Sequence, residues 1–417
     1  MSKVLKDFAS YVIEKIDVKK LTSKNYIGID NMLPNKSGVT LSEYKPIEGQ
    51  AISFKTGDIL IGNIRPYFKK IWLATFDGGC SQDVLCIRSN GEISSKFLYA
   101  LLSQDSFFNY DMAGSKGSKM PRGDKNHIMN YPIQNINDKE KIGKFIVNID
   151  EKIENNNKIN TELESMAKTI YDYWFLQFEF PNEEGKAYKS SGGKMVWNEE
   201  LKREIPKGWK VSSIEKENIY SSDYTANGSF ASLAKNVKYN EGKRYAILIR
   251  IIDFNNKFNN LDDMVYVDKH AYDYLEKSSL FGDEIIICNV GNVGAIYRCP
   301  NLGMPMTLGP NGIVVNSKEY NNYLYMFFKS SIGQQQLLSI SSGSIQLKFN
   351  KTNFRSLPFL IPHEEILSKF DEIYNPIYNK QKQIWKQNQE LTSLRDFLLP
   401  LLMNGQVGFK EVGLADA

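Results

Sequence analysis

The sequence predicts an α+β protein in which two pseudo-repeated α/β domains are joined by two long helices, and three observations support this prediction. Residues 115–132 align without a gap on residues 341–358, which lie 226 residues further along the chain. Each segment follows short apolar runs bounded by Gly, Asn and Pro, a pattern typical of strands. Each is followed by a long stretch in which apolar residues recur at alternating steps of four and three.

The repeat is supported by identical residues at nearly constant offset. A period of 226 residues exceeds the roughly 20–50 residues of solenoid repeats, so a duplicated domain is expected. A chain of 417 residues is also long enough for two or three domains. The matching pairs are Ser115/Ser341, Gly117/Gly343, Ser118/Ser344, Lys125/Lys351 and Pro132/Pro358, and Gly57-Asp58 meets Gly282-Asp283 at an offset of 225.

The expected elements and boundaries follow from these patterns. Strands are predicted at 58–64, 83–88, 283–290 and 311–316, and short helices at 96–107 and 322–333. The Gly, Ser, Lys and Glu content of 181–208 indicates a linker. We therefore expect a first α/β domain at 1–137, a first long helix at 138–180, the linker at 181–208, a second α/β domain at 209–362, a second long helix at 363–405 and a C-terminal tail at 406–417.

Apolar residues at alternating steps of four and three form one stripe along each long helix, and this stripe predicts a coiled coil. Because each helix carries one stripe, we expect the two to pair antiparallel within the chain, with Asn160 meeting Lys380 in a polar layer; homodimerisation through the same stripes is the competing interpretation. Pro376 is expected to kink the second helix because it removes a backbone donor. The predicted seam comprises Ile142, Ile146, Ile149, Ile153, Asn156, Asn160, Leu163, Ala167, Ile170 and Trp174, and then Ile366, Phe370, Ile373, Ile377, Lys380, Ile384, Gln387, Leu391, Leu394 and Leu398.

Composition is that of an ordinary globular protein, with 42% hydrophobic and 24% charged residues. The net charge of +4 is small, so an anionic partner has to be met by local basic patches. The first residues contain no apolar run typical of a signal peptide, and no stretch approaches the roughly 18 apolar residues of a membrane span. The four cysteines form no CxxC pair, which favours free thiols in a reducing cytoplasm and no metal site.

No catalytic motif stands out. The chain has no GxxxxGK[ST] phosphate loop, and it has no Pro-Pro dipeptide of the kind that amino-methyltransferases use to hold a flipped base. Its three histidines are scattered, so no Ser-His-Asp arrangement can be assembled from adjacent motifs. We therefore expect no catalytic residue in this chain.

A basic loop recurs at the same place in both halves. Gly and Ser beside Lys and Arg allow the backbone to approach phosphates closely, and Asn, Gln and Arg can read base edges. A solvated surface turn is the simpler interpretation of either loop alone, but recurrence in both halves favours a function. The candidate DNA-binding residues are Arg65, Lys69, Lys70, Lys116, Lys119, Arg122 and Lys125 in the first half, and Asn289, Asn292, Gln346, Lys348, Lys351 and Arg355 in the second.

Short motifs in a fixed order give the chain a family resemblance. They are GDILIGNIRP at 57–66, GKAYKSSGGKM at 185–195, IPKGW at 205–209 and LLPLLMNG at 398–405. Each is weak alone, but together with the order of domains and helices the chain resembles the specificity (S) subunit of type I restriction-modification systems, the HsdS family. The first half departs from the pattern, because it has no IPKGW-like start.

The resemblance implies a function that spacing cannot show. The two α/β domains would be target-recognition domains, each reading one half of a bipartite, asymmetric DNA site. The helices would set the gap and dock two methyltransferase (M) subunits. These would carry the S-adenosylmethionine for adenine-N6 methylation, so this chain would bind no cofactor, and restriction/translocase (R) subunits would complete the complex.

Two other classes of function stay open from the sequence. One is a stand-alone DNA methyltransferase or nuclease, against which the missing base-flipping motif argues. The other is a coiled-coil scaffold without a role on DNA, which the recurring basic loops disfavour.

Overall fold

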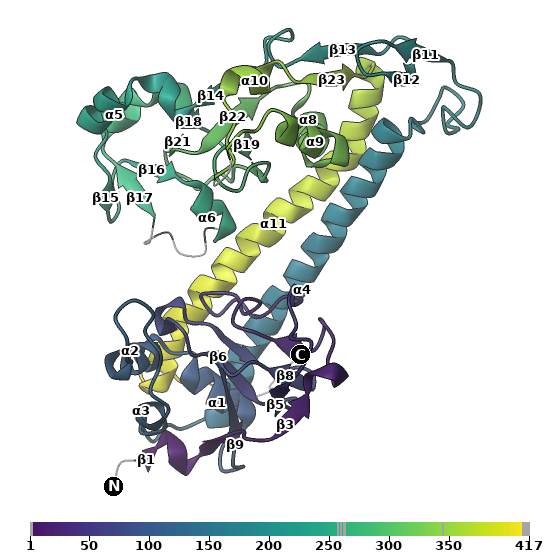
Figure 1. Ribbon diagram of the computed structural model, residues 1–417. Coiled ribbons are helices and arrows are strands. Elements are labelled where there is room, and N and C mark those ends of the chain that lie inside the picture. Colours follow the sequence, from purple (N-terminus) through teal and green to yellow (C-terminus); the bar gives the residue numbers. More distant parts are fainter. Residues whose placement is uncertain (1–2, 257, 259–260, 262–263, 344–345, 411–417) are drawn as a thin grey trace, which may run out of the picture. The chain divides into compact units, whose positions relative to one another are not determined.

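The computed structural model describes residues 3–410 except 257, 259–260, 262–263 and 344–345, so the predicted partner Ser344 lies outside the described residues. The chain divides into two compact units. The first unit comprises Met1–Lys158 and Lys386–Ala417, and the second unit comprises Ile159–Trp385. Both contain sheets and short helices, and two long helices pass through them (Figure 1). The predicted α+β class with two long helices is confirmed.

The first unit is built on two four-stranded sheets. One is antiparallel throughout and has the order β2 (Ala9–Tyr11), β9 (Val84–Ser89), β6 (Ile59–Gly62), β7 (Ile71–Leu73). The other has the order β3 (Lys15–Asp17), β5 (Gln50–Phe54), β8 (Gly78–Cys80), β4 (Tyr26–Ile27). The unit also contains the β1 (Lys3–Val4) and β10 (Pro132–Ile133) pair, the helices α1 (Ser95–Leu102), α2 (Asp105–Gly114) and α3 (Lys125–Met129), and the 3-10 helices Leu5–Asp7, Val18–Lys20 and Pro66–Phe68.

The second unit repeats the antiparallel sheet with the same order: β14 (Tyr220–Asp223), β22 (Gly312–Asn316), β19 (Ile285–Cys288), β20 (Ile296–Arg298). Its other sheet differs and has five strands: β15 (Asn240–Glu241), β17 (Val265–Val267), β16 (Ala246–Ile249), β21 (Met306–Leu308), β18 (Ser279–Leu280). The counterparts of the small elements are the β13 (Lys210–Ser213) and β23 (Pro358–Ile361) pair and the helices α8 (Asn321–Lys329), α9 (Ser331–Ser339) and α10 (Lys351–Arg355). The unit also contains α5 (Phe230–Asn236), α6 (Ile251–Asn255) and α7 (Lys269–Tyr274).

The repeat holds at the level of single hydrogen bonds. The N–H of Lys55 donates to the Asp58 carboxylate at 2.8 Å, and 226 residues later the N–H of Phe281 donates to the Glu284 carboxylate at 2.7 Å. Asp58 therefore corresponds to Glu284 rather than to Asp283, its predicted match. The sequence match is shifted by one residue because Gly57 lies directly before Asp58, whereas Gly282 lies two residues before Glu284.

The segment predicted as a linker has local structure of its own. Residues 181–208 contain the antiparallel hairpin of β11 (Met195–Asn198) and β12 (Arg203–Pro206). Its Ile205, with the adjoining Phe180 and Trp209, is buried in the core of the second unit. The hairpin is therefore part of that unit.

The long helices α4 (Lys139–Tyr171) and α11 (Glu364–Met403) contact each other in opposite directions within each unit (Figure 1). In the first unit, Ile142 and Ile146 of α4 share a core with Leu399 and Leu402 of α11. In the second unit, Tyr171 near the end of α4 packs on Phe370 near the start of α11, with ring centroids 6.3 Å apart. The α11 helix is continuous through both Pro376 and Pro400.

The polar layer differs from the prediction. In the first unit, the Asn156 amide donates to Gln387 and Asn388, both at 2.8 Å. In the second unit, Gln381 donates to the backbone oxygen of Asn160 at 3.4 Å, and Lys380 is exposed. The predicted layer of Asn160 with Lys380 is therefore wrong.

The seam on α11 is also one residue out of phase at every second position. Ile373 and Leu394 are 41% and 44% exposed, whereas the following residues Tyr374 and Arg395 are each 3% exposed. The apolar side chains of Ile373 and Leu394 fitted a heptad stripe better than tyrosine and arginine do, which explains the wrong prediction. Of the other seam candidates, Ile142, Ile146, Ile149, Ile366, Phe370, Ile377 and Ile384 are buried, and Ile153, Asn160, Leu163, Ile170 and Leu391 are half-buried.

The buried Arg395 is held by acids on both helices. Its guanidinium donates to Asp150 of α4 at 2.7 Å and to Asp396 at 3.0 Å, and the hydroxyl of Tyr99 donates to the second oxygen of Asp150 at 2.7 Å.

Within the described residues, no helix is both long and apolar enough to cross a membrane.

Candidate nucleic-acid interface

In the first unit, the candidate DNA-binding residues belong to two segments, 63–70 and 114–125, that lie side by side. Ile64, which follows β6, forms a β-bridge with Arg122, and Arg122 forms a second bridge with Lys116. The N–H of Arg65 also donates to the backbone oxygen of Pro121 at 2.8 Å. The segments 63–70 and 114–125, separated in sequence, therefore form one bridged loop.

The second unit contains the same bridged loop 226 residues later. Val290 bridges Lys348, and Ser342 bridges Lys348. The N–H of Gly291 donates to the backbone oxygen of Leu347 at 3.0 Å, which matches the bond from Arg65 to Pro121. The duplication has thus preserved backbone hydrogen bonds in a place where most side chains differ.

Both loops depend on a glycine at the same turn. Gly117 and Gly343 have positive φ values of 97° and 112°, which side-chain-bearing residues rarely adopt. A Cβ at Gly117 would lie 3.2 Å from the Met120 carbonyl oxygen, and one at Gly343 would lie 2.4 Å from the Gln346 carbonyl oxygen. The turn explains why glycine is retained at both positions.

A short helix follows each loop and is capped in the same way. Asp124 accepts hydrogen bonds from the N–H groups of Asn126 and His127 at the start of α3, and Asn350 accepts one from the N–H of Asn353 at the start of α10. The Lys116 ammonium lies 2.5 Å from Asp124, and together with the backbone donors it lowers the pKa of that carboxyl to about 2. Lys116 therefore fastens the loop to the helix.

Several predicted phosphate-binding residues already have partners within the unit. Lys69 pairs with Asp105 at 2.9 Å, and the Lys70 ammonium donates to the backbone oxygen of Ile29 at 2.6 Å, while burial lowers its pKa. Lys351 pairs with Asp223 at 3.2 Å and is half-buried. These three side chains support the loops, and their binding to phosphates stays a prediction.

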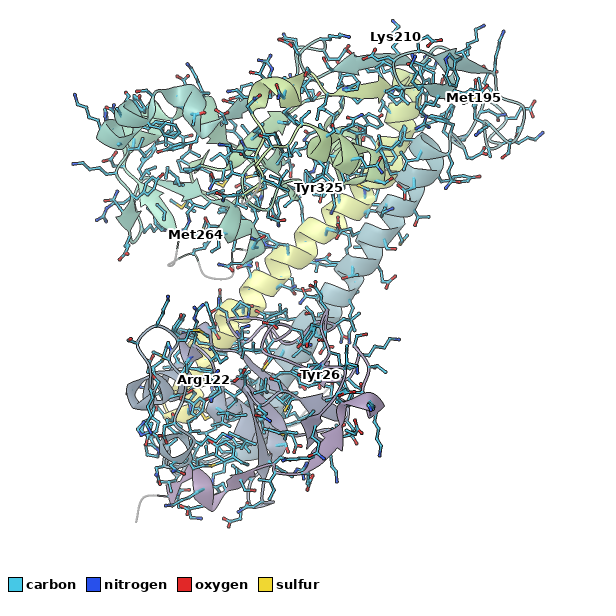
Figure 2. The ribbon with its side chains drawn as sticks, in the orientation of Figure 1. Tyr26, Arg122, Met195, Lys210, Met264 and Tyr325 are labelled. Carbon is cyan, nitrogen blue, oxygen red and sulfur yellow. The ribbon has the colours of Figure 1, made fainter. Side chains whose placement is uncertain are left out.

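The other candidates differ in how freely they face solvent. Arg122, labelled in Figure 2, is exposed and lies 3.1 Å from Asp83, and the Asn289 side chain donates to the backbone oxygen of Phe349 at 3.2 Å. Arg65, Asn289 and Arg355 are half-buried. The exposed candidates are Lys116, Lys119, Arg122 and Lys125 in the first unit and Asn292, Gln346 and Lys348 in the second.

Sequence reasoning missed Asn63 and Asp111, which lie behind the first loop. A Cβ on Gly123 would lie 2.2 Å from a carboxylate oxygen of Asp111 and 2.8 Å from the amide oxygen of Asn63. None of these oxygens accepts a hydrogen bond from a described residue, and burial raises the pKa of Asp111 to about 7. Asn63 could have been found, because it matches Asn289 at the offset of 226, and the amide oxygen of Asn289 is also buried without a partner among the described residues.

The described residues do not form a metal centre. They contain no group of three His, Cys, Asp or Glu side chains placed to hold an ion, and Cys80, Cys86, Cys288 and Cys299 are buried free thiols. The repeated and exposed feature of both units is thus the bridged polar loop.

Comparisons with known proteins agree with the motif-based resemblance. No family model matches the chain. The type I restriction enzyme MjaIX specificity subunit of Methanocaldococcus jannaschii is 25% identical over 338 residues, which cover 77% of this chain and 71% of that protein. The HindI specificity subunit of Haemophilus influenzae is 24% identical, covering 97% of this chain and 98% of its own length.

A solved structure shares the fold. The S subunit of a type I restriction-modification system from M. genitalium matches with a TM-score of 0.52 and 16% identity, over 96% of this chain and 95% of that one. The resemblance predicted from the motifs is confirmed.

Proposed function

We propose that this chain, a relative of type I restriction enzyme specificity subunits, is the DNA sequence-specificity subunit of such a complex. Each unit reads one part of a bipartite target. The observation that carries the proposal is the bridged loop, whose backbone bonds recur in both units while its exposed side chains differ. A shared frame with different side chains suits two modules that approach DNA alike and read different bases.

The exposed side chains of the loops fit the chemistry of a duplex. Lys119 and Lys125 can neutralise phosphates, which gives affinity without sequence information. Arg122 can donate two hydrogen bonds to guanine, and the Gln346 amide can pair with adenine. The two loops thus offer different donors and acceptors to the two half-sites.

The chain itself is non-catalytic in this proposal. Two methyltransferase subunits dock on the long helices and carry the S-adenosylmethionine, and restriction/translocase subunits join them in the cytoplasm. Exposed apolar side chains recur every seven residues in the second unit, at Ile159 and Met166 on α4 and at Tyr173 on the π-helical turn Asp172–Leu176 that continues it. They are 44%, 53% and 42% exposed. This spacing places them on one face of the helix, as a helix-docking partner requires.

The first test is the map of N6-methyladenine in host DNA with and without this gene, read by single-molecule sequencing. We expect deletion to abolish methylation at one split motif and to leave other motifs unchanged. Replacing residues 209–362 with those of a relative should then change one half of that motif. A change in both halves, or a methylation map that does not depend on the gene when a partner methyltransferase is expressed, would contradict the proposal.

A further inference from the structure

The first unit carries two exposed aromatic rings next to its bridged loop. Tyr67 and Phe68 are 47% and 38% exposed, and their ring centroids are 4.8 Å apart. They lie on the one-turn 3-10 helix Pro66–Phe68. A single exposed aromatic residue is ordinary on a protein surface, whereas an adjacent pair on one tight turn forms an apolar tip.

The turn that carries the rings has an unusual backbone. Arg65 before it and Lys69 after it both have left-handed conformations, with φ values of 52° and 50°. The loop that supports it contains two more, Asn35 and Lys36, at 54° and 59°. Left-handed conformations of non-glycine residues persist only where the surroundings impose them, and they gather at functional sites.

Backbone bonds and an ionic network impose this conformation. The N–H of Asn35 donates to the backbone oxygen of Phe68 at 2.8 Å, and the N–H of Lys36 donates to that of Lys69 at 2.9 Å. The buried Lys36 ammonium lies 3.1 Å from Asp105 and 3.2 Å from Asp396. Asp105 also holds Lys69, so the tip is fixed on both sides before any partner arrives.

The tip is joined to the loop that we propose contacts DNA. The bond from the Arg65 N–H to the Pro121 oxygen places the turn directly beside Arg122. In the second unit the bridged loop is the same, but the positions of Tyr67 and Phe68 are taken by Val293 and Gly294. The aromatic tip is therefore a difference between two otherwise matching loops.

We infer that Tyr67 and Phe68 stack on the bases of a distorted step in the half-site read by the first unit; the inference rests on the proposed function. Apolar side chains that enter a base step unstack it and kink the duplex. Pyrimidine–purine steps are the easiest to deform, so the first half-site gains a preference for such a step without a hydrogen bond to it. The second half-site is read without this distortion.

The test uses the full chain with its methyltransferase subunits and duplexes that contain the bipartite target found by methylation mapping. 2-Aminopurine replaces one base at a time in either half-site, never the adenine that is methylated, the base paired with it or a base stacked on either, because flipping of the target adenine would itself raise the fluorescence there. We expect the fluorescence to rise on binding at one step of the first half-site and at no step of the second. The double variant Tyr67→Ser, Phe68→Ser should abolish this rise and weaken binding roughly 5- to 100-fold, the range for losing base–aromatic stacking.

The matched control is Val293→Ser, which should leave fluorescence and affinity unchanged. The thermal unfolding midpoint of the double variant should equal that of the unmodified chain, because both rings are exposed. Binding without any fluorescence rise, or an equal rise in the double variant, would overturn the stacking inference and leave the proposed function standing. Unchanged DNA binding with loss of methyltransferase co-elution would overturn it by placing the tip at a protein interface. A complex that binds no DNA would overturn both.

Discussion

The bridged loops of the two units have the same backbone and different chemistry. In the first loop Arg122 faces the acid Asp83, and Asp111 lies buried behind it. In the second loop the matching residues are the exposed Lys348 and the fully buried Leu337. The comparison teaches that the frame, set by backbone bonds and one glycine, is separable from the side chains that it presents.

The units also differ where α4 and α11 meet. The first unit buries the ionic group of Asp150 and Arg395, whereas the second packs aromatic rings of Tyr171, Phe370 and Tyr374. Breaking the ionic group should therefore destabilise the first unit alone. Arg395→Ala leaves Asp150 without its charged partner, and we expect a loss of about 3–5 kcal/mol in the free energy of unfolding, measured by urea titration.

The neighbouring residue supplies the control for that prediction. Leu394→Ala should cost less than about 0.5 kcal/mol, because its side chain is 44% exposed. An equal loss in the free energy of unfolding for Arg395→Ala and Leu394→Ala would contradict the burial of Arg395 rather than Leu394 in the seam.

Asp111 distinguishes the first loop by its response to pH. Its folded-state pKa, raised by burial to about 7, exceeds the ordinary value of about 3.9 for an unfolded chain. The protonated carboxyl is therefore favoured in the folded state, and its stabilising contribution is fully present below about pH 4 and is lost as the pH rises through about 7. Asp111→Leu, which copies Leu337, should remove this dependence and stabilise the first unit at pH 8 by roughly 2–4 kcal/mol.

Urea titrations at several pH values between 4 and 8 measure this effect. The matched substitution Leu337→Asp should introduce the same pH dependence into the second unit. An unchanged pH profile in Asp111→Leu would mean that the carboxyl is solvated in the folded chain.

The shared frame can be broken at its glycine. Gly343→Ala should lower the free energy of unfolding by about 1–3 kcal/mol, because the residue has a positive φ and the new Cβ would lie 2.4 Å from the Gln346 carbonyl oxygen. Gly117→Ala should cost about 1 kcal/mol, since its nearest atom is 3.2 Å away. The DNA affinity of each variant for duplexes with one half-site altered at a time reports which loop is affected. A larger loss in the free energy of unfolding for Gly117→Ala than for Gly343→Ala would contradict the geometries of the two turns.

Much of the fold could be predicted because the repeat is local. The identities at Gly117/Gly343 and Pro132/Pro358 lie in or next to turns whose backbone is the same in both units, so a few residues located the whole frame. The second sheets could not be predicted in this way, because they have different strand orders, with four strands in the first unit and five in the second. Sequence identity persisted where the backbone geometry permits few residue types.

The errors came from contacts that are distant in the chain. The partners of Lys69 and Lys70 within the unit, Asp105 and Ile29, could not be predicted, because they lie in segments with no sequence link to these lysines. The seam on α11 was misplaced because burial of Arg395 depends on Asp150 of the other helix. Local periodicity favoured Leu394 and contains no information about such a partner.

The discontinuous first unit sets an order of events during synthesis. Residues up to Lys158 leave the ribosome long before Lys386, and at about 5–20 residues per second the delay is roughly 10–45 s. During that time Ile142 and Ile146 lack the cover of Leu399 and Leu402, while the contiguous second unit can complete its core. The nascent chain therefore finishes the second domain first, and the first domain waits, with part of its apolar core open to chaperones, for the end of translation.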